Sequence, residues 1–160
     1  MEKIKIKRNT NGDSRVAVKA PTISEFMESN REHRRDVDQM MSEIANEIKK
    51  AGSYHDWTKS VDPYKSSFYR DLCNTIEGRI TFDDGEWFEE HYTEERHHLL
   101  KRCPDDVNLI DVLEMICDCV CAGMARSGEV YDIEIPAEIL TAAVKNTAQM
   151  CIDSVELMDK

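Results

Sequence analysis

The stretch NLIDVLEMICDCVCAGMAR, residues 108–126, decides the fold class of this chain. Apolar residues cover nearly every face of a helix drawn through it, which is typical of a helix buried at the centre of a bundle. Asp111, Glu114 and Asp118 nevertheless share one narrow stripe, because residues three and four apart lie on the same side of a helix. The stripe is either the only solvent-facing side of this helix or one wall of an internal polar site, where carboxylates need cations or hydrogen bonds.

Four further helices are predicted on either side of this segment. Thr22 and Glu25 have the spacing of a capping box, and Asp62 followed by Pro63 is a second helix start. The expected helices cover residues 22–52, 62–78, 86–100 and 136–155. Together with the central segment they predict an all-α protein, a bundle of about five helices.

The N-terminal residues carry a different pattern. Ile4 and Ile6 alternate with charged residues before an Asn-Gly-Asp turn signal at 11–13, and apolar residues alternate again after it. This favours a short β-hairpin, but a hairpin alone is only marginally stable, so a flexible tail is the alternative. We therefore expect a hairpin or tail over residues 1–20 and a single helical domain over residues 21–160.

Composition and charge exclude several classes of protein. The chain has 160 residues, of which 41% are hydrophobic, so it can form one core and is not generally disordered. A net charge of −11 makes duplex nucleic acid a poor partner, because such binding relies on Lys and Arg at phosphates. No apolar run reaches the ~18 residues that would cross a membrane. The N-terminus lacks the pattern of a secretion signal, so we expect a cytoplasmic protein whose six cysteines are reduced, small core residues.

Candidate metal ligands occur in and after the first predicted helix. His33 lies on the apolar face of that helix, where a lone histidine would be interpreted as buried and hydrogen-bonded. His55 and Asp56 follow the helix, and such a pair can bind one divalent cation through an imidazole nitrogen and a carboxylate oxygen. Lys59 comes one helical turn later, within reach of a phosphate near that cation.

Three more histidines belong to the third predicted helix. His91 and His98 are seven residues apart, which places them on one face of a helix. His97 would point about a third of a turn away, toward solvent. Glu94 and Glu95 each precede a histidine by three residues, the spacing of a di-iron helical bundle. That architecture requires a second such motif on another helix, which the sequence does not show.

Taken in order, these residues resemble the H…HD…D pattern of the HD-domain superfamily, metal-dependent phosphohydrolases with a helical core. The form His55-Asp56-x-x-Lys59 is similar to the HDxxK variant of that pattern. The segments HDWTK, HH and LEMICD also resemble an uncharacterised HD-like family that is frequent in phage and prophage genes. The resemblance extends over residues 32–128.

The resemblance implies a metal site. The ligands that it implies are His33, His55, Asp56 and Asp118. Asp111 is the alternative to Asp118, because it lies on the same face of the same predicted helix. The two central histidines are closer in sequence than in two-metal members of the superfamily. We therefore expect a single divalent ion, one of Mn, Fe, Co, Ni, Zn or Mg.

The resemblance also implies an activity. Lys59, His91 and His98 would be the catalytic groups of the pocket, with His97 as the alternative to His98. The expected reaction is hydrolysis of a small phosphorylated substrate, with nucleotides as first candidates, as in a 5′-nucleotidase or phosphodiesterase. The alternative is a phage-derived regulatory or binding protein that keeps the HD scaffold without catalysis. A homodimer is compatible with either reading.

Overall fold

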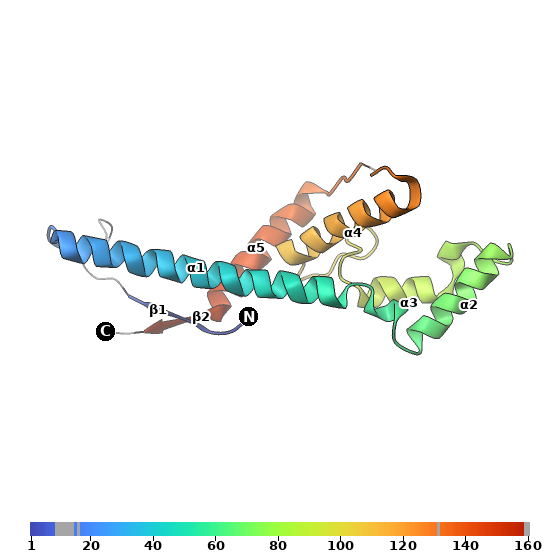
Figure 1. The fold of residues 1–160 in the computed structure, drawn as a ribbon, viewed down its shortest axis with the longest axis horizontal. Helices are drawn as coiled ribbons and strands as arrows, with labels where there is room; N and C mark the ends of the chain where they lie inside the picture. The colour runs from blue at the N-terminus through green and yellow to red at the C-terminus, as the bar shows by residue number, and fades with distance from the viewer. Residues whose placement is uncertain (9–14, 16, 131, 159–160) are drawn as a thin grey trace. The chain divides into compact units, whose positions relative to one another are not determined.

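The computed structural model describes residues 1–8, 15, 17–130 and 132–158. Within them the chain forms five α-helices, two short strands and two single-turn 3₁₀ helices (Figure 1). The helices are α1 Ile23–Tyr54, α2 Tyr64–Ile76, α3 Glu86–Glu94, α4 Leu109–Ser127 and α5 Ala137–Ser154; the strands are β1 Ile4–Lys7 and β2 Val155–Met158. No helix among the described residues is long and apolar enough to cross a membrane. The prediction of an all-α protein with about five helices is confirmed.

The chain groups into two compact units. The first combines Met1–Glu47 with Ala148–Lys160, and the second is Ile48–Thr147. Helices α1 and α5 each contribute to both units. The division that the sequence suggests, after residue 20, does not coincide with these units and stays a prediction.

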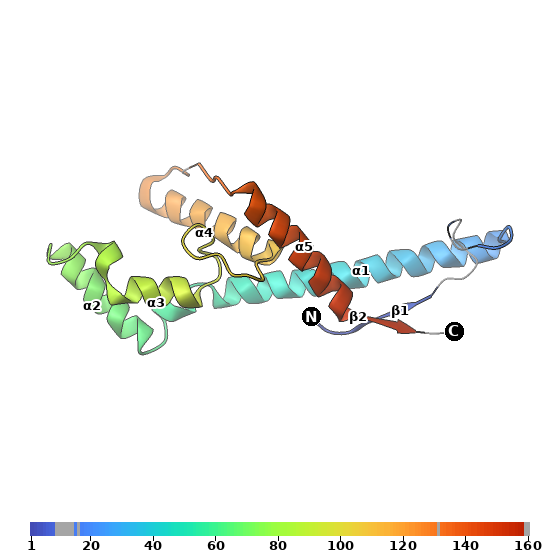
Figure 2. The same cartoon turned by 180° about the vertical axis from the view of Figure 1, so that it is seen from behind.

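The first unit contains β1 and β2, which pair in parallel with Ile4 opposite Val155 (Figure 2). Ile4 is buried at the start of this pairing. The partner of β1 is therefore the C-terminal strand and not the segment after the Asn-Gly-Asp turn of the predicted hairpin. That turn, at 11–13, lies outside the described residues. Parallel strands need a long crossover, here the whole helical part of the chain, so no local sequence signal reports this pairing.

Local capping signals set several helix ends. The backbone N–H of Glu25 donates to Thr22 Oγ1, and the backbone N–H of Thr22 donates to Glu25 Oε2, so the predicted capping box is present. Gly78 follows α2 and Gly128 follows α4, with φ angles of 74° and 75°. Only glycine adopts this left-handed conformation without a steric penalty. These ends depend on neighbouring residues alone, which is why the sequence predicts them well.

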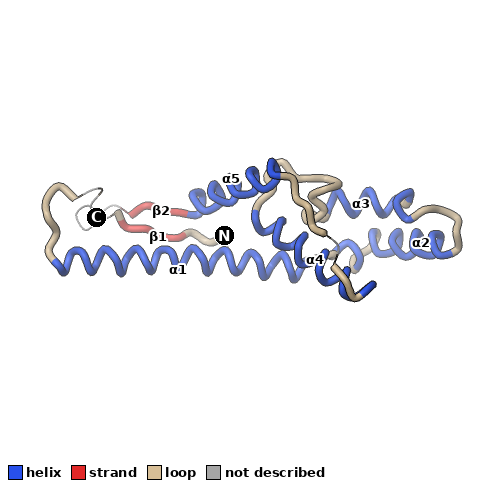
Figure 3. Tube along the Cα trace, turned by 90° about the horizontal axis from the view of Figure 1, so that it is seen from above, coloured by secondary structure: helices blue, strands red, loops and turns tan. Residues whose placement is uncertain are grey.

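The third helix is shorter than the sequence predicts. Its expected range is 86–100, but α3 ends at Glu94, because Glu95 has an extended backbone with φ −95° and ψ 116°. The Glu95 carboxylate is buried and accepts hydrogen bonds from Thr58, which belongs to a distant segment. A tertiary contact here overrides a helical pattern, and the chain continues as a loop up to α4 (Figure 3).

The core of the second unit forms around α4. Its buried members are Leu99, Val107, Val112, Met115 and Ala143. The backbone N–H of Leu109, at the start of α4, also donates to Thr147 Oγ1 of α5 over 2.9 Å. Because Leu99 comes from the loop after α3, this core holds that loop against α4 and so fixes the histidines that precede Leu99.

Candidate metal centre

Ligand-type side chains of the second unit converge from four segments of the chain. Two follow α1, one lies on α3, two lie in the loop after α3 and two lie on α4: His55, Asp56, His91, His97, His98, Glu114 and Asp118. His91 and His97 are 3% and 1% exposed. Buried polar side chains are normally paired, so the partners of each group indicate what the cluster can do.

Asp56 connects the parts of this cluster. Its backbone is left-handed, with φ 55° and ψ 31°, a conformation that Asp and Asn adopt more readily than other side-chain-bearing residues. Oδ1 is 3.4 Å from His91 Nε2 and 3.9 Å from His97 Nε2. Oδ2 is 3.5 Å from His55 Nε2 and forms an ion pair with Lys59. Burial opposes the charged carboxylate, but the hydrogen bond and charge of Lys59 outweigh it and lower the pKa of Asp56.

Thr58 orients the ring of His91. Thr58 Oγ1 donates its only proton to Glu95 Oε1 over 2.9 Å, because a carboxylate can only accept. Oγ1 must therefore accept the proton of His91 Nδ1, which is 2.8 Å away. The neutral His91 ring then has its lone pair at Nε2, 2.7 Å from His98 Nε2. These partners thus select the tautomer in which Nε2 of His91 can bind a cation.

Both His91 and His98 are held in the neutral form. Burial and the charge of His98 lower the pKa of His91 to about 3. Burial and the charge of His97 lower the pKa of His98 to about 4. Because only a neutral imidazole can donate a lone pair to a metal ion, these environments favour metal binding at neutral pH.

His97 lies between the histidines and the acidic stripe of α4. Its Nδ1 is 3.1 Å from Glu114 Oε1, but this contact lacks hydrogen-bond geometry. Burial disfavours a charged ring, yet Glu114, Asp56 and Asp118 outweigh that effect and raise the pKa of His97. Glu114 Oε1 is also 3.0 Å from His55 Nδ1, and His55 Nε2 is 3.4 Å from Asp118 Oδ1. Glu114 and Asp118 of the stripe thus form one wall of an internal polar site.

Together with Glu95, these side chains form three groups whose ligand atoms are close enough to hold one ion, within 4.8 Å of one another. The groups are Asp56, His91, His97 and His98; His55, His97 and Asp118; and Glu95, His97 and Glu114. Imidazole and carboxylate together are a donor set for divalent transition metals. Asp56 Oδ1 and both ring nitrogens of His97 are buried without hydrogen-bond partners among the described residues. These atoms fit a bound cation, because buried polar atoms are otherwise satisfied.

The structure brings together most of the residues that the sequence predicts for the site. His55, Asp56, Lys59, His91, His98 and Asp118 all belong to the second unit and lie in or beside these groups. His33 lies on α1 within the first unit, and none of the ligand groups found among the described residues includes it. Its role as a metal ligand stays a prediction.

Asp111, the alternative to Asp118, has other partners. Its two carboxylate oxygens accept hydrogen bonds from the Arg96 guanidinium over 2.8 Å each. One of them also accepts the backbone N–H of Asn108 over 2.9 Å, as part of the capping box that begins α4. Asp111 therefore caps the helix, whereas Asp118 lies next to His55, as does Glu114.

The expectation that His97 points to solvent is wrong. It assumes that the third helix continues to residue 100, whereas α3 ends at Glu94 and the following loop turns His97 inward. The alternative of a di-iron helical bundle fails for the same reason. Its Glu-x-x-His motif requires the glutamate and the histidine to lie on one helix, and α3 ends before both histidines. Thr58 carries no signal in its local sequence, since its role depends on His91 and Glu95 reaching it from elsewhere.

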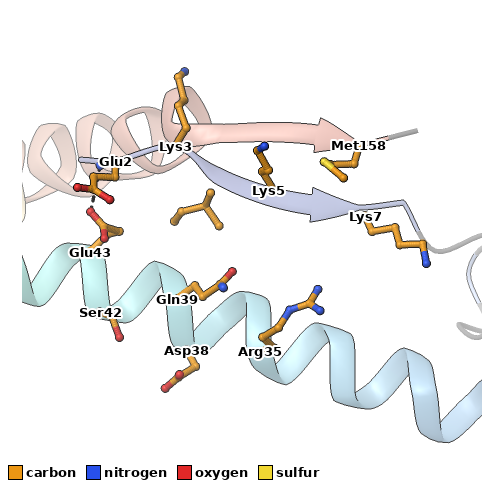
Figure 4. A pocket seen from close by; sticks show the side chains of 11 residues that line it. Glu2, Lys3, Lys5, Lys7, Arg35, Asp38, Gln39, Ser42, Glu43 and Met158 are labelled. Atoms are coloured by element: carbon orange, nitrogen blue, oxygen red, sulfur yellow. Dashed lines mark hydrogen bonds between the residues drawn. The ribbon is translucent and has the colours of Figure 1, made fainter. Parts of the chain in front are cut away.

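Each unit contains a cavity. A cavity of about 260 Å³ opens beside the cluster and is lined in part by His55, Glu114 and Asp118. A cavity of about 610 Å³ lies between β1 and α1 in the first unit (Figure 4). Three basic side chains along it are paired: Lys3 Nζ donates to the carbonyl of Asp153 over 2.6 Å, Lys7 pairs with Glu32, and Arg35 pairs with Asp36. The smaller cavity therefore lies beside the ligand groups and shares three of their residues.

The cysteines differ in their surroundings. All six are free thiols, and Cys119 packs against the core as expected. Cys103, Cys117 and Cys121 are exposed, so the interpretation of all cysteines as core residues is wrong for these three. Cys117 and Cys121 line the smaller cavity, one helical turn apart on α4.

Replacing Thr58 with valine is expected to weaken metal binding and to lower stability. Valine keeps the shape but leaves the buried His91 Nδ1 without its acceptor, while Glu95 loses the hydroxyl donor and keeps only the backbone N–H of residue 58. The loss costs about 1–3 kcal/mol of unfolding free energy. Loss of a group that orients a ligand also lowers metal affinity by roughly 10–100-fold. Urea unfolding and a metal titration measure the two effects, with Thr58→Ser as the matched control that retains the hydroxyl. Unchanged affinity in Thr58→Val would contradict the orienting role.

The chain matches a family model over most of its length. The model, described as a family of unknown function, DUF5662, covers residues 22–154 and so includes all the ligand-type residues of the cluster. No curated protein and no solved structure matches the chain. The protein is therefore a member of the DUF5662 family.

Proposed function

We propose that this protein is a divalent-metal-dependent hydrolase of small phosphate esters. The observation that carries the proposal is the cluster of four histidines and four carboxylates with unpartnered buried atoms on Asp56 and His97. The order of these residues along the chain resembles that of HD-domain phosphohydrolases, which suggests the type of reaction. Because a fold supports many functions, the proposal rests on the donor set rather than on the helices.

The first ligand group suits a transition metal. Asp56, His91, His97 and His98 offer one carboxylate and three imidazoles. This set favours Mn, Fe, Co, Ni or Zn over Mg, which prefers oxygen ligands. We propose one ion, because His97 is common to all the groups. When bound, the ion supplies a Lewis acid that polarises a phosphoryl group and lowers the pKa of an attacking water.

Lys59 and Asp118 lie beside these ligands, and their positions suggest a role for each in the reaction. Lys59 contacts Asp56, and its ammonium lies 5.8 Å from the ring centre of Trp87, so its charge is held at the edge of the cluster. There it offsets negative charge on a substrate phosphate. Asp118 is partly exposed beside His55, where its carboxylate orients an attacking water and accepts its proton.

A nucleotide is the first substrate class to test. A metal ion and Lys59 together recognise a phosphate, whereas a net charge of −11 disfavours large polyanions. The six free cysteines fit a reducing compartment, and we propose that the reaction takes place in the cytoplasm.

A turnover screen tests the proposal. Protein stripped by a chelator is reloaded with one divalent metal at a time and given nucleoside 5′-monophosphates, cyclic nucleotides and an aryl phosphate. Hydrolysis that requires the metal and stops on renewed chelation is the expected result. Metal binding without turnover of any ester would overturn the enzyme and favour a regulatory or binding protein on the same scaffold.

Metal binding is expected to stabilise the fold. Asp56, Glu114 and Asp118 bring negative charge into one half-buried region, which a cation would balance. An ion that binds only the folded state adds about 2.7 kcal/mol at a concentration of 100 times its Kd. For a chain of this length that corresponds to a rise of roughly 5–10 °C in Tm. Thermal unfolding with metal or with EDTA measures the shift; His55→Ala should reduce it, and identical Tm values for the wild type would argue against a buried site.

A further inference from the structure

We propose that the cavity of about 260 Å³ beside the metal cluster binds the organic part of the substrate, a compact, uncharged and apolar group such as an aryl ring. The inference rests on the proposed function, because a phosphate at the cluster is what would direct the organic group here. Occupancy of the cavity can nevertheless be measured without turnover.

The cavity is continuous with the cluster. His55, Glu114 and Asp118 line the cavity and also belong to the ligand groups. Because His55 and Asp118 form one ligand group with His97, an ion bound by this group would hold a phosphate beside the cavity. The ester oxygen of that phosphate then leads the attached group into the remaining space.

The rest of the lining carries no charge. Ile48, Ala51 and Gly52 come from α1, and Ile110, Leu113, Cys117 and Cys121 come from α4. A charged or hydroxyl-rich group would lose water here without gaining hydrogen bonds, whereas an apolar group gains by leaving water. The volume is close to the lower end of the range of ~300–1,000 Å³ for small-molecule pockets, which favours a compact group. Aryl and alkyl phosphates are therefore preferred over sugar phosphates and polyphosphates. Among the esters of the turnover screen, the aryl phosphate is expected to react faster than the nucleotides, whose ribose is rich in hydroxyl groups.

Cysteine alkylation reports directly on occupancy of the cavity. Cys117 and Cys121 are exposed and line it, whereas Cys103 is exposed but is not part of the lining. Metal-loaded protein is treated with iodoacetamide in the presence of phenylphosphonate or methylphosphonate, and each cysteine is followed by peptide fragmentation in a mass spectrometer. The two probes carry the same phosphonate group, and neither is hydrolysed. We expect phenylphosphonate to protect Cys117 and Cys121 at concentrations on the order of tenfold lower than methylphosphonate, with Cys103 unaffected.

A pair of variants on α4 tests whether the phenyl ring of phenylphosphonate occupies the cavity. Leu113→Phe fills the cavity and is expected to abolish the preference for phenylphosphonate while protection by methylphosphonate remains. Val120→Phe is the matched control, because Val120 is 39% exposed and Leu113 is 43% exposed, yet only Leu113 lines the cavity. The control variant should behave like the wild type.

The outcomes separate this inference from the proposed function. Equal protection by both phosphonates, or no protection by phenylphosphonate, overturns the inference whether or not the protein hydrolyses phosphate esters. If phenylphosphonate slows the alkylation of Cys103 as much as that of Cys117 and Cys121, the inference is also overturned, because the protection would then not come from the cavity. Selective protection in a protein that turns over no ester supports the cavity as a binding site, while the proposed hydrolase function fails.

Discussion

Replacing Asp56 with asparagine is expected to remove metal binding and, with it, hydrolysis. Asp56 brings one oxygen toward His91 and His97 and the other toward His55, and an amide has lost the negative charge that a cation requires. Removing a residue that only orients a ligand costs roughly 10–100-fold in affinity, so losing a direct ligand should cost more than about 100-fold. Asparagine also adopts the left-handed backbone found here, at φ 55°, so the fold should survive.

Equilibrium dialysis with elemental analysis measures the loss of metal, and circular dichroism checks the helices. The matched control is Asp62→Asn, because Asp62 pairs with Lys65 three residues later just as Asp56 pairs with Lys59. The control should keep its metal and its activity. Full metal occupancy in Asp56→Asn would remove Asp56 from the ligand set.

Replacing Lys59 with alanine is expected to lower kcat/KM for a phosphomonoester by about 10²–10³, by analogy with removing one donor from a developing oxyanion. The ammonium is an ion-pair partner of Asp56, but it is not a ligand, since an ammonium has no lone pair to donate. Metal content should therefore be retained while the charge that offsets the phosphate is lost. Lys59→Arg keeps the charge and should recover part of the activity.

Steady-state kinetics together with metal analysis of the same preparations decide this prediction. The control is Lys65→Ala, which removes an equivalent pair, Asp62 with Lys65. Neither residue belongs to a ligand group, so kcat/KM should be unchanged. Equal activity of wild type and Lys59→Ala would leave the enzyme in place but exclude Lys59 from its site. A loss of metal in Lys59→Ala would instead show that its ion pair holds Asp56 in position.

Short-range patterns in the sequence determined the helical class and several boundaries. The Thr22–Glu25 capping box and Gly78 act through neighbours in the chain, so their effects can be read locally. The same holds for the acidic stripe of α4, because helical spacing alone places Glu114 and Asp118 on one side. His55 and Asp56 are recognisable as candidate ligands because they are adjacent in sequence.

Tertiary structure alone decided which side chains meet in the cluster. The contact between Glu95 and Thr58 ends α3 early, and this end brings His97 inward against Glu114. Arg96 in turn pairs with Asp111, so that Asp118 and not Asp111 lies beside His55. The pairing of β1 with β2 joins the two ends of the chain in the same way. Each of these outcomes depends on contacts between residues far apart in sequence. The free energy of such contacts outweighs local helix or strand propensity, and the residues that form them show no periodic pattern in the sequence.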